Sequence, residues 1–182
     1  MADEQTNIKN FPIAGAPPNT PRSMPHNLPA EQNLLGAILL DNSVIERIDD
    51  RLVAAHFYDP LHGQIFTTMQ RLIERSQLAN PVTLKSFFAN STDLDDGDVA
   101  TYLSELADGV ISITQAADYA HTIYEAHIRR ELILIGDEVI FEASQPTIDA
   151  PANLQIEAAE AKLFKLAETE TASAGLRGFE SV

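Results

Sequence analysis

The fold is built around residues Ser112 to Ser144, which read SITQAADYAHTIYEAHIRRELILIGDEVIFEAS. It contains no proline and a single glycine, Gly136. Its apolar residues recur at the three- and four-residue spacing of a helix. Ser112 and Gln115 form an S-x-x-Q capping box at its start, and Gln145-Pro146 follows as a stop signal. The pattern predicts one helix over about 112–144, about 50 Å long at ~1.5 Å per residue.

The C-terminal half of this predicted helix is apolar on nearly every side. It contains Leu132-Ile133-Leu134-Ile135 and then Val139-Ile140-Phe141. A helix that is apolar all round must be covered on more than one side. A small domain can rarely supply that cover alone, so the sequence predicts contact with a second subunit.

Composition limits the classes of function that the chain can serve. The chain has 182 residues, a net charge of −15, a pI near 4.5 and no cysteine. The acidic balance opposes a direct grip on nucleic acid and on anionic membranes. The missing cysteines exclude disulfides and thiolate chemistry. No apolar run approaches the ~18–20 residues of a membrane span, so we expect a cytoplasmic protein.

The pattern along the chain divides it into four parts. Residues 1–27 are predicted to be a disordered, proline-rich leader, because their apolar content is too thin for a core. Residues 28–110 read as a head of short helices, and residues 111–168 as a helical hairpin. In that hairpin a return helix over about 152–167 follows a connector of about seven residues, which favours antiparallel packing. The polar tail, 169–182, reads as the start of a linker.

No convincing strand alternation occurs, so we predict an all-α fold: a small multi-helix globular head followed by a long antiparallel helical hairpin. Asp59-Pro60 is a cap followed by a first-turn proline. Ser43 with Glu46 forms a second capping box, and Thr83 is a further candidate cap. The predicted head core, in which we expect the histidine to pack and form hydrogen bonds, is Leu35, Ile38, Leu39, Phe57, His62, Ile65, Phe66, Leu84, Tyr102 and Leu103.

Several short motifs occur together in a fixed order. They are Leu28-Pro29-Ala30-Glu31-Gln32, Leu35-Gly36-Ala37-Ile38-Leu39, Phe57-Tyr58 with His62 and Ile65-Phe66, Pro81-Val82-Thr83-Leu84, Tyr102-Leu103, Tyr119-Ala120, and Arg130 before Leu132-Ile133. From about Pro25 to Ala167 the chain resembles the N-terminal domain of the bacterial replicative DNA helicase, the DnaB-type hexameric helicase.

The resemblance implies a collar domain. Hairpins would pair between subunits as a dimer, or as a ring built from three dimers, above ATP-driven motor domains that unwind DNA at the replication fork. The collar would receive the C-terminal domain of primase, and a helicase loader would engage the protein elsewhere. The resemblance also suggests that Arg130 occupies a family position.

The ATPase motor itself has no counterpart in this sequence. A P-loop needs G-x-x-x-x-G-K-[ST], and none of the eight glycines is followed by lysine. We therefore expect no enzymatic activity and no cofactor in this chain. ATP and Mg would belong to a motor domain outside it, and we expect the chain to be a domain excised from a longer helicase.

Two acid–histidine pairs at helical spacing raise the possibility of a metal site. They are Asp59-x-x-His62 and Asp118-x-x-His121. Metal sites in helical bundles use paired Glu-x-x-His motifs with further glutamates, and no Glu-x-x-His occurs here. Asp59 is better explained as a cap, and Asp118 as a first-turn acid that the helix dipole favours. We nominate no metal ligand and no catalytic residue.

The candidate functional surface is therefore the hairpin. Arg130 either joins local ion pairs, worth about 0.3–0.5 kcal/mol each, or pairs across the hairpin or between subunits. Gly136 costs about 1 kcal/mol in a helix, which a close helix approach would offset unless the glycine is merely tolerated. Alternatives to a helicase collar are a free-standing helical adaptor and a helical-bundle metal protein. The predicted contact residues are Ile128, Arg130, Leu132, Ile135, Gly136, Val139, Ile140, Ile156, Leu163 and Phe164.

Overall fold

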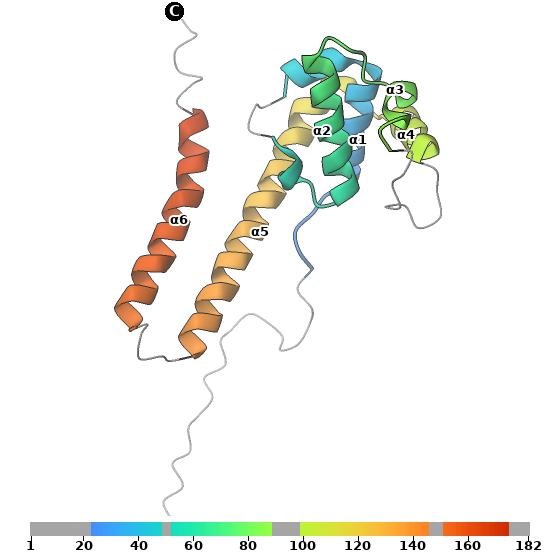
Figure 1. Ribbon diagram of the computed structural model, residues 1–182. Helices are drawn as coiled ribbons and strands as arrows, with labels where there is room; N and C mark the ends of the chain where they lie inside the picture. The colour runs from blue at the N-terminus through green and yellow to red at the C-terminus, as the bar shows by residue number, and fades with distance from the viewer. Residues whose placement is uncertain (1–22, 49–51, 89–98, 146–150, 175–182) are drawn as a thin grey trace, which may run out of the picture.

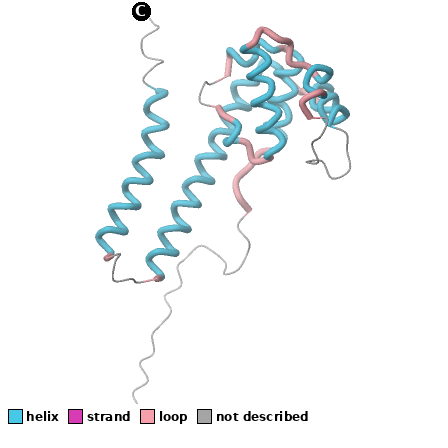
Figure 2. Tube along the Cα trace, viewed as in Figure 1, coloured by secondary structure: helices cyan, strands magenta, loops and turns pink. Residues whose placement is uncertain are grey.

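The computed structural model describes residues 23–48, 52–88, 99–145 and 151–174, and every regular element in those ranges is helical. A head of short helices sits on one end of a long helix, and a second long helix returns beside it (Figure 1). The tube view shows the same two parts (Figure 2). The predicted all-α head and hairpin are confirmed. Most of the predicted leader and the end of the predicted tail lie outside the described residues.

The described part of the head contains four α-helices and two short 3-10 helices. Their bounds are α1 Leu28–Leu40, η1 Asn42–Glu46, η2 Ala54–His56, α2 Pro60–Glu74, α3 Pro81–Lys85 and α4 Val99–Asp108. Asn27 caps α1 by accepting the N–H of Ala30 at 3.0 Å. Asp59 caps α2 by accepting the N–H of Leu61 at 2.8 Å, as predicted.

Two other predicted caps are wrong. Asp41, not Ser43, caps η1 by accepting the N–H of Ser43 at 3.0 Å. Asn80 caps α3 by accepting the N–H groups of Val82 and Thr83, while Thr83 accepts the N–H of Asn80. In each case an Asx residue lies just before the expected start, and its short carboxylate or amide reaches the free N–H groups directly.

Helix α1 forms the centre of the head, and it packs against α2, α4 and α5. Every residue from Leu34 to Leu39 is buried, as expected for a helix surrounded on all sides. A methyl group on Gly36 would collide with the carbonyl oxygen of Leu106, so glycine is what lets α1 approach α4 so closely.

The hairpin is built from α5, Ala116–Ser144, and α6, Ala152–Ala174, which contact each other. Helix α5 starts later than predicted, after the 3-10 turn η3, Ile113–Gln115. Ser112 does not cap it, because the Ser112 hydroxyl lies 2.9 Å from the Thr114 hydroxyl instead. Helix α6 continues seven residues beyond the predicted return helix.

Burial divides α5 into two parts. Its buried residues are Ala116, Ala120, Ile123 and Tyr124, all in the first third of the helix, where it packs into the head. No residue of α5 beyond Tyr124 is buried, and neither is any residue of α6 from Ala152 to Glu168. The hairpin thus leaves the head as two helices that cover each other only in part.

Candidate assembly surface

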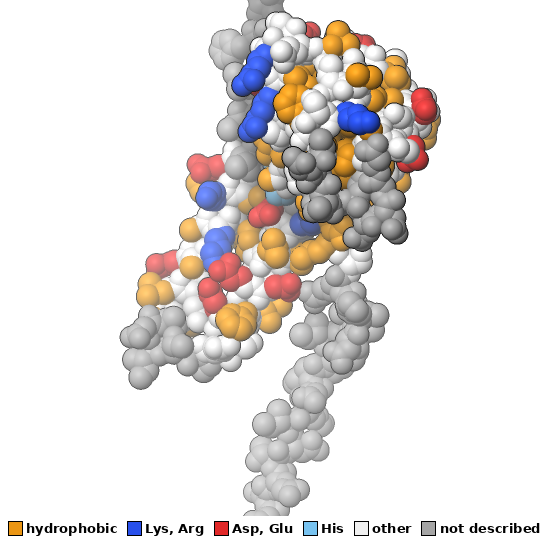
Figure 3. Space-filling view, turned by 45° about the vertical axis from the view of Figure 1, so that its right-hand side comes forward, with side chains coloured by type: hydrophobic (Ala, Val, Ile, Leu, Met, Phe, Trp, Pro, Cys, Tyr) orange, Lys and Arg blue, Asp and Glu red, His pale blue; other side chains and the backbone are white. Residues whose placement is uncertain are grey.

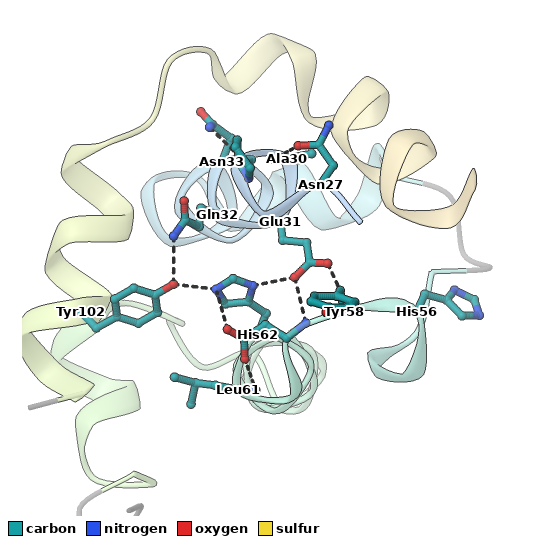
Figure 4. Close-up of polar contacts among 12 residues, drawn as sticks. Asn27, Ala30, Glu31, Gln32, Asn33, His56, Tyr58, Leu61, His62 and Tyr102 are labelled. Atoms are coloured by element: carbon teal, nitrogen blue, oxygen red, sulfur yellow. Dashed lines mark hydrogen bonds and ion pairs between the residues drawn. The ribbon is translucent and has the colours of Figure 1, made fainter. Parts of the chain in front are cut away.

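The head holds a buried polar network that joins three helices (Figure 4). The Glu31 carboxylate accepts the N–H of Tyr58 at 2.7 Å and lies 2.7 Å from Nδ1 of His62. The other ring nitrogen of His62 lies 2.6 Å from the Tyr102 hydroxyl, which also accepts from Gln32 at 3.3 Å. Glu31 comes from α1, His62 from α2 and Tyr102 from α4, so this network fixes how the three helices pack.

The network is not a convincing reaction centre. Glu31 and His62 are both 1% exposed, so a substrate has no access to them. Burial is also the main reason that the pKa of Tyr102 is raised, which keeps its hydroxyl protonated as a hydrogen-bonding group. The described residues hold no group of three or more His, Cys, Asp or Glu side chains arranged to bind a metal ion.

The two hairpin helices meet through polar side chains. The Lys162 ammonium on α6 lies 2.6 Å from the Glu138 carboxylate and 3.9 Å from that of Glu142, both on α5. The hydrogen bond to Glu138 is the main reason that the pKa of Lys162 is raised. Gln155 donates to the carbonyl oxygen of Glu142 at 3.2 Å. These contacts hold the two helices side by side without burying their apolar residues.

A groove of about 630 Å³ lies between α5, α6 and the 3-10 helix η2 of the head. Its walls combine apolar side chains with charged ones, including Glu131 and Glu138 from α5 and Lys162 and Lys165 from α6. Ile128 and Ile135 of the predicted contact set line this groove and are partly exposed.

Other apolar side chains of the predicted set stay open to solvent in the single chain. Leu132 is 46% exposed, Ile140 59%, Ile156 60% and Phe164 64%. Figure 3 shows one side of the hairpin, below the head, where apolar side chains lie among acidic and a few basic ones. Exposure of this extent, concentrated on two adjacent helices, is typical of a surface that another molecule covers.

Helical geometry divides these exposed residues into separate surfaces. Each residue turns an α-helix by about 100°, so Leu132 lies half a turn from Ile123, which packs into the head. Leu132, Gly136 and Val139 share one side of α5. In an antiparallel pair, Ile156 and Leu163 of α6 fall on the same side of the hairpin. We call Leu132, Gly136, Val139, Ile156 and Leu163 the hairpin face. Ile140 and Phe164 point further round, to the outer edges.

Gly136 and Arg130 do not serve contacts within the hairpin. Apart from its chain neighbours and the backbone of its own helix turn, a methyl group on Gly136 would meet no atom within 4 Å, so no close approach within the described chain requires the glycine. Arg130 does not pair with α6 as one expectation had it: its guanidinium donates to the carbonyl oxygens of Pro25 and His56, at 2.9 and 2.7 Å. Arg130 contacts the head and not α6 because it lies on the side of α5 that the head loops approach.

The residues predicted for the head core lie within one hydrophobic cluster or beside it. Leu35, Ile38, Leu39, Phe57, Ile65, Phe66, Leu84 and Leu103 are buried apolar residues, and His62 and Tyr102 belong to the polar network. Glu31, His56 and His127 were missed by sequence reasoning. Glu31 had a signal, because a glutamate among the apolar residues of α1 must find hydrogen-bond partners if buried. His56 and His127 lie far apart in the sequence, and no sequence pattern indicated that they would meet.

The structure is that of a small helical head that carries an exposed helical hairpin. Residues 23–125 match the family described as DnaB-like helicase N-terminal domain. The chain belongs to this family. The replicative DNA helicase DnaB of Rickettsia bellii is 36% identical over 168 residues, which are 92% of this chain and 34% of that protein. That of Rickettsia felis is 37% identical over 147 residues, 81% of this chain and 30% of that protein.

Two solved structures are similar as well. The crystal structure of the N-terminal domain of DnaB helicase from Mycobacterium tuberculosis has a TM-score of 0.67 at 27% identity, and the match covers 78% of this chain and 99% of that one. A DnaB-like replicative helicase, described with its interactions with primase, has a TM-score of 0.60 at 25% identity, covering 86% of this chain and 35% of that one. This chain thus spans about a third of the length of the curated relatives it matches. In the described residues, no helix is both long enough and apolar enough to span a membrane.

Proposed function

We propose that this domain is the collar and assembly module of a replicative DNA helicase, and that copies of it associate through the hairpin face. The observation that carries the proposal is the exposure of apolar side chains on a hairpin that is otherwise well formed. A second copy that covers Leu132 and Ile156 would remove from water the surface that the chain leaves open. Membership of the DnaB-like helicase N-terminal domain family supports the same proposed role.

The test compares two exposed leucines on opposite sides of the hairpin. Leu132→Asp places a charge on the hairpin face, whereas Leu154→Asp places one on an exposed leucine, 48% accessible, on the other side. Burying one such side chain contributes about 1.5–3 kcal/mol, so Leu132→Asp should weaken association roughly 10- to 100-fold. Leu154→Asp should leave it unchanged. Sedimentation velocity measures the association, and far-UV circular dichroism checks the helices.

An equal loss of association in both variants would contradict the assignment of this face. Unchanged association in Leu132→Asp, with helices intact, would contradict the use of the face at all. The same experiment distinguishes a dimer from a ring of three dimers, because the wild-type mass in solution is measured with it.

Partners beyond a second copy follow from the family. We propose that the collar is a docking platform for the C-terminal domain of primase and that the whole helicase unwinds DNA with ATP and Mg in its motor domain. A helicase loader is a further proposed partner. Titration calorimetry with the isolated primase domain tests the docking, and the absence of heat with both wild type and Leu154→Asp would contradict it. The protein named with primase interactions is the support for this part.

A further inference from the structure

One side chain of the hairpin ties two separate segments of the head to α5. From Nη1, Arg130 donates to the carbonyl oxygen of Pro25 at 2.9 Å, and from Nη2 to that of His56 at 2.7 Å. Its guanidinium carbon also lies 5.8 Å from the centre of the Tyr58 ring. Pro25 leads into α1 and His56 ends η2, so the two arms of a single guanidinium join the chain before α1 and the chain before α2 to the same point on α5.

The guanidinium suits this task because its donors are held in a rigid planar fork. Two carbonyl groups from different segments must be at the right separation and angle to satisfy that fork together. Arg130 lies beyond Tyr124, the last buried residue of α5. It is therefore placed where the well-packed head gives way to the open hairpin, and where a small change in packing would change the angle between them most.

Two histidines stack beside the arginine. The ring centres of His56 and His127 are 4.3 Å apart with 25° between the ring planes, and the ring of Tyr124 meets His56 edge-on with 5.2 Å between the centres. Nδ1 of His56 lies 3.3 Å from the backbone N–H of Val53 and accepts it, which it can do only when that nitrogen carries no proton. This hydrogen bond beside the stack therefore needs a His56 whose Nδ1 is unprotonated.

The surroundings favour the neutral rings. Burial, then the charges of His127 and Arg130, lowers the pKa of His56 to about 4. Burial also lowers the pKa of His127, with Arg130 acting in the same direction and Glu131 in the opposite one. Across the groove from the stack lie Lys162 and Lys165 of α6, and Glu138 lies further along α5. On the head side His26 stacks on Tyr58.

We propose that Arg130 is a positioning residue that fixes the angle between head and hairpin, and that it does so only while the His56–His127 stack beside it is neutral. Protonation of both rings would place three cations in one cluster and remove the bond from Val53. The folded chain favours neutral His56. The stabilisation that this histidine gives to the folded chain is therefore complete above its ordinary pKa of 6.5 and is lost as the pH falls toward about 4. The angle between head and hairpin would set the position of the head relative to the hairpin face. This consequence for assembly rests on the proposed function.

The chain contains no cysteine, so two introduced cysteines would be the only labelling sites, and the distance between their labels reports the angle between head and hairpin. Gln77→Cys on the head and Asn153→Cys on α6, both at exposed positions, can carry a pair of spin labels. Pulsed electron paramagnetic resonance, on labelled protein diluted in excess unlabelled protein, then gives the distance within one chain. We expect one narrow distance at neutral pH, and we expect Arg130→Met to broaden it.

Arg130→Lys keeps the charge but lacks the fork, so it should not restore the narrow distance. Arg129→Met is the matched control, because Arg129 is exposed and its nearest acidic partner is Glu125 on the same helix, at 3.5 Å. We expect this variant to keep the wild-type distance. A folded Arg130→Met variant with an unchanged distance distribution would overturn the proposal.

A pH series on the otherwise unchanged chain tests the histidine requirement, even if Arg130→Met fails to fold. The distance should broaden as the pH falls from the ordinary histidine pKa of 6.5 to about 4, and His127→Phe, which keeps an aromatic ring without a charge, should broaden less. Far-UV circular dichroism defines the pH range in which the helices persist. A constant distance over that range would overturn the requirement. Because the measurement concerns single chains, it can succeed or fail independently of association through the hairpin face.

Discussion

The head and the hairpin contain apolar residues in similar helical patterns but bury them very differently. In the head, Leu34, Phe66 and Leu103 have no exposed surface, whereas on the hairpin Phe141 and Phe164 are 63% and 64% exposed. The head encloses α1 with helices on every side. The hairpin has only two helices, which meet through Lys162 and its two glutamates. Helical pattern alone therefore does not distinguish a core residue from an interface residue, because burial depends on how many other helices cover it.

The largest contrast should come from removing one phenylalanine from each region. Phe66→Ala leaves a cavity in the closed core and should lower the free energy of unfolding by about 3–5 kcal/mol. Phe164→Ala removes a ring that is mostly in water and should change it by less than about 0.5 kcal/mol. Urea denaturation at one protein concentration measures both. Similar losses in the two variants would show that the hairpin is covered in solution at the concentration used.

The buried network allows a second contrast, between two glutamates. Glu31→Gln keeps the size of the side chain but turns an amide N–H₂ toward groups that donate to the carboxylate. Leaving a buried donor unpaired costs about 1–3 kcal/mol, so we expect a loss of about 2–3 kcal/mol in the free energy of unfolding. Glu157→Gln, at an exposed position on α6, is the control and should be nearly neutral. Equal stability of the two variants would mean that the network does not hold the head together.

The smallest contrast compares two glycines within helices. Gly36→Ala should destabilise the head by about 1–3 kcal/mol, because its methyl group has no room beside the carbonyl of Leu106. Gly136→Ala should stabilise α5 by up to about 1 kcal/mol, since alanine is the better helix former and the space is open. Thermal unfolding of a dilute sample shows whether each variant is more or less stable than the wild type. A destabilised Gly136→Ala variant that also fails to associate would instead place a partner helix against Gly136.

Much of the head could be predicted from local chemistry. Asp59-Pro60 specified the start of α2, and the apolar spacing of the helices located the main core residues. The errors in the caps have one cause: several serine, threonine and Asx residues stand near each helix start, and only the folded backbone decides which one reaches a free N–H. Arg130 and the His56–His127 stack were beyond prediction, because the contacts join residues about 70 or more positions apart.

The sequence alone predicted the helical class and the excess of apolar surface on α5. It could do so because helical period, proline and glycine act locally. How that apolar surface is divided among the head, the groove and solvent depends instead on tertiary packing. Ile123 and Tyr124 pack into the head, Ile128 and Ile135 line the groove, and Leu132 and Val139 stay uncovered. That division depends on where the head loops and α6 meet α5, and such meetings between distant segments are set by packing of the whole chain.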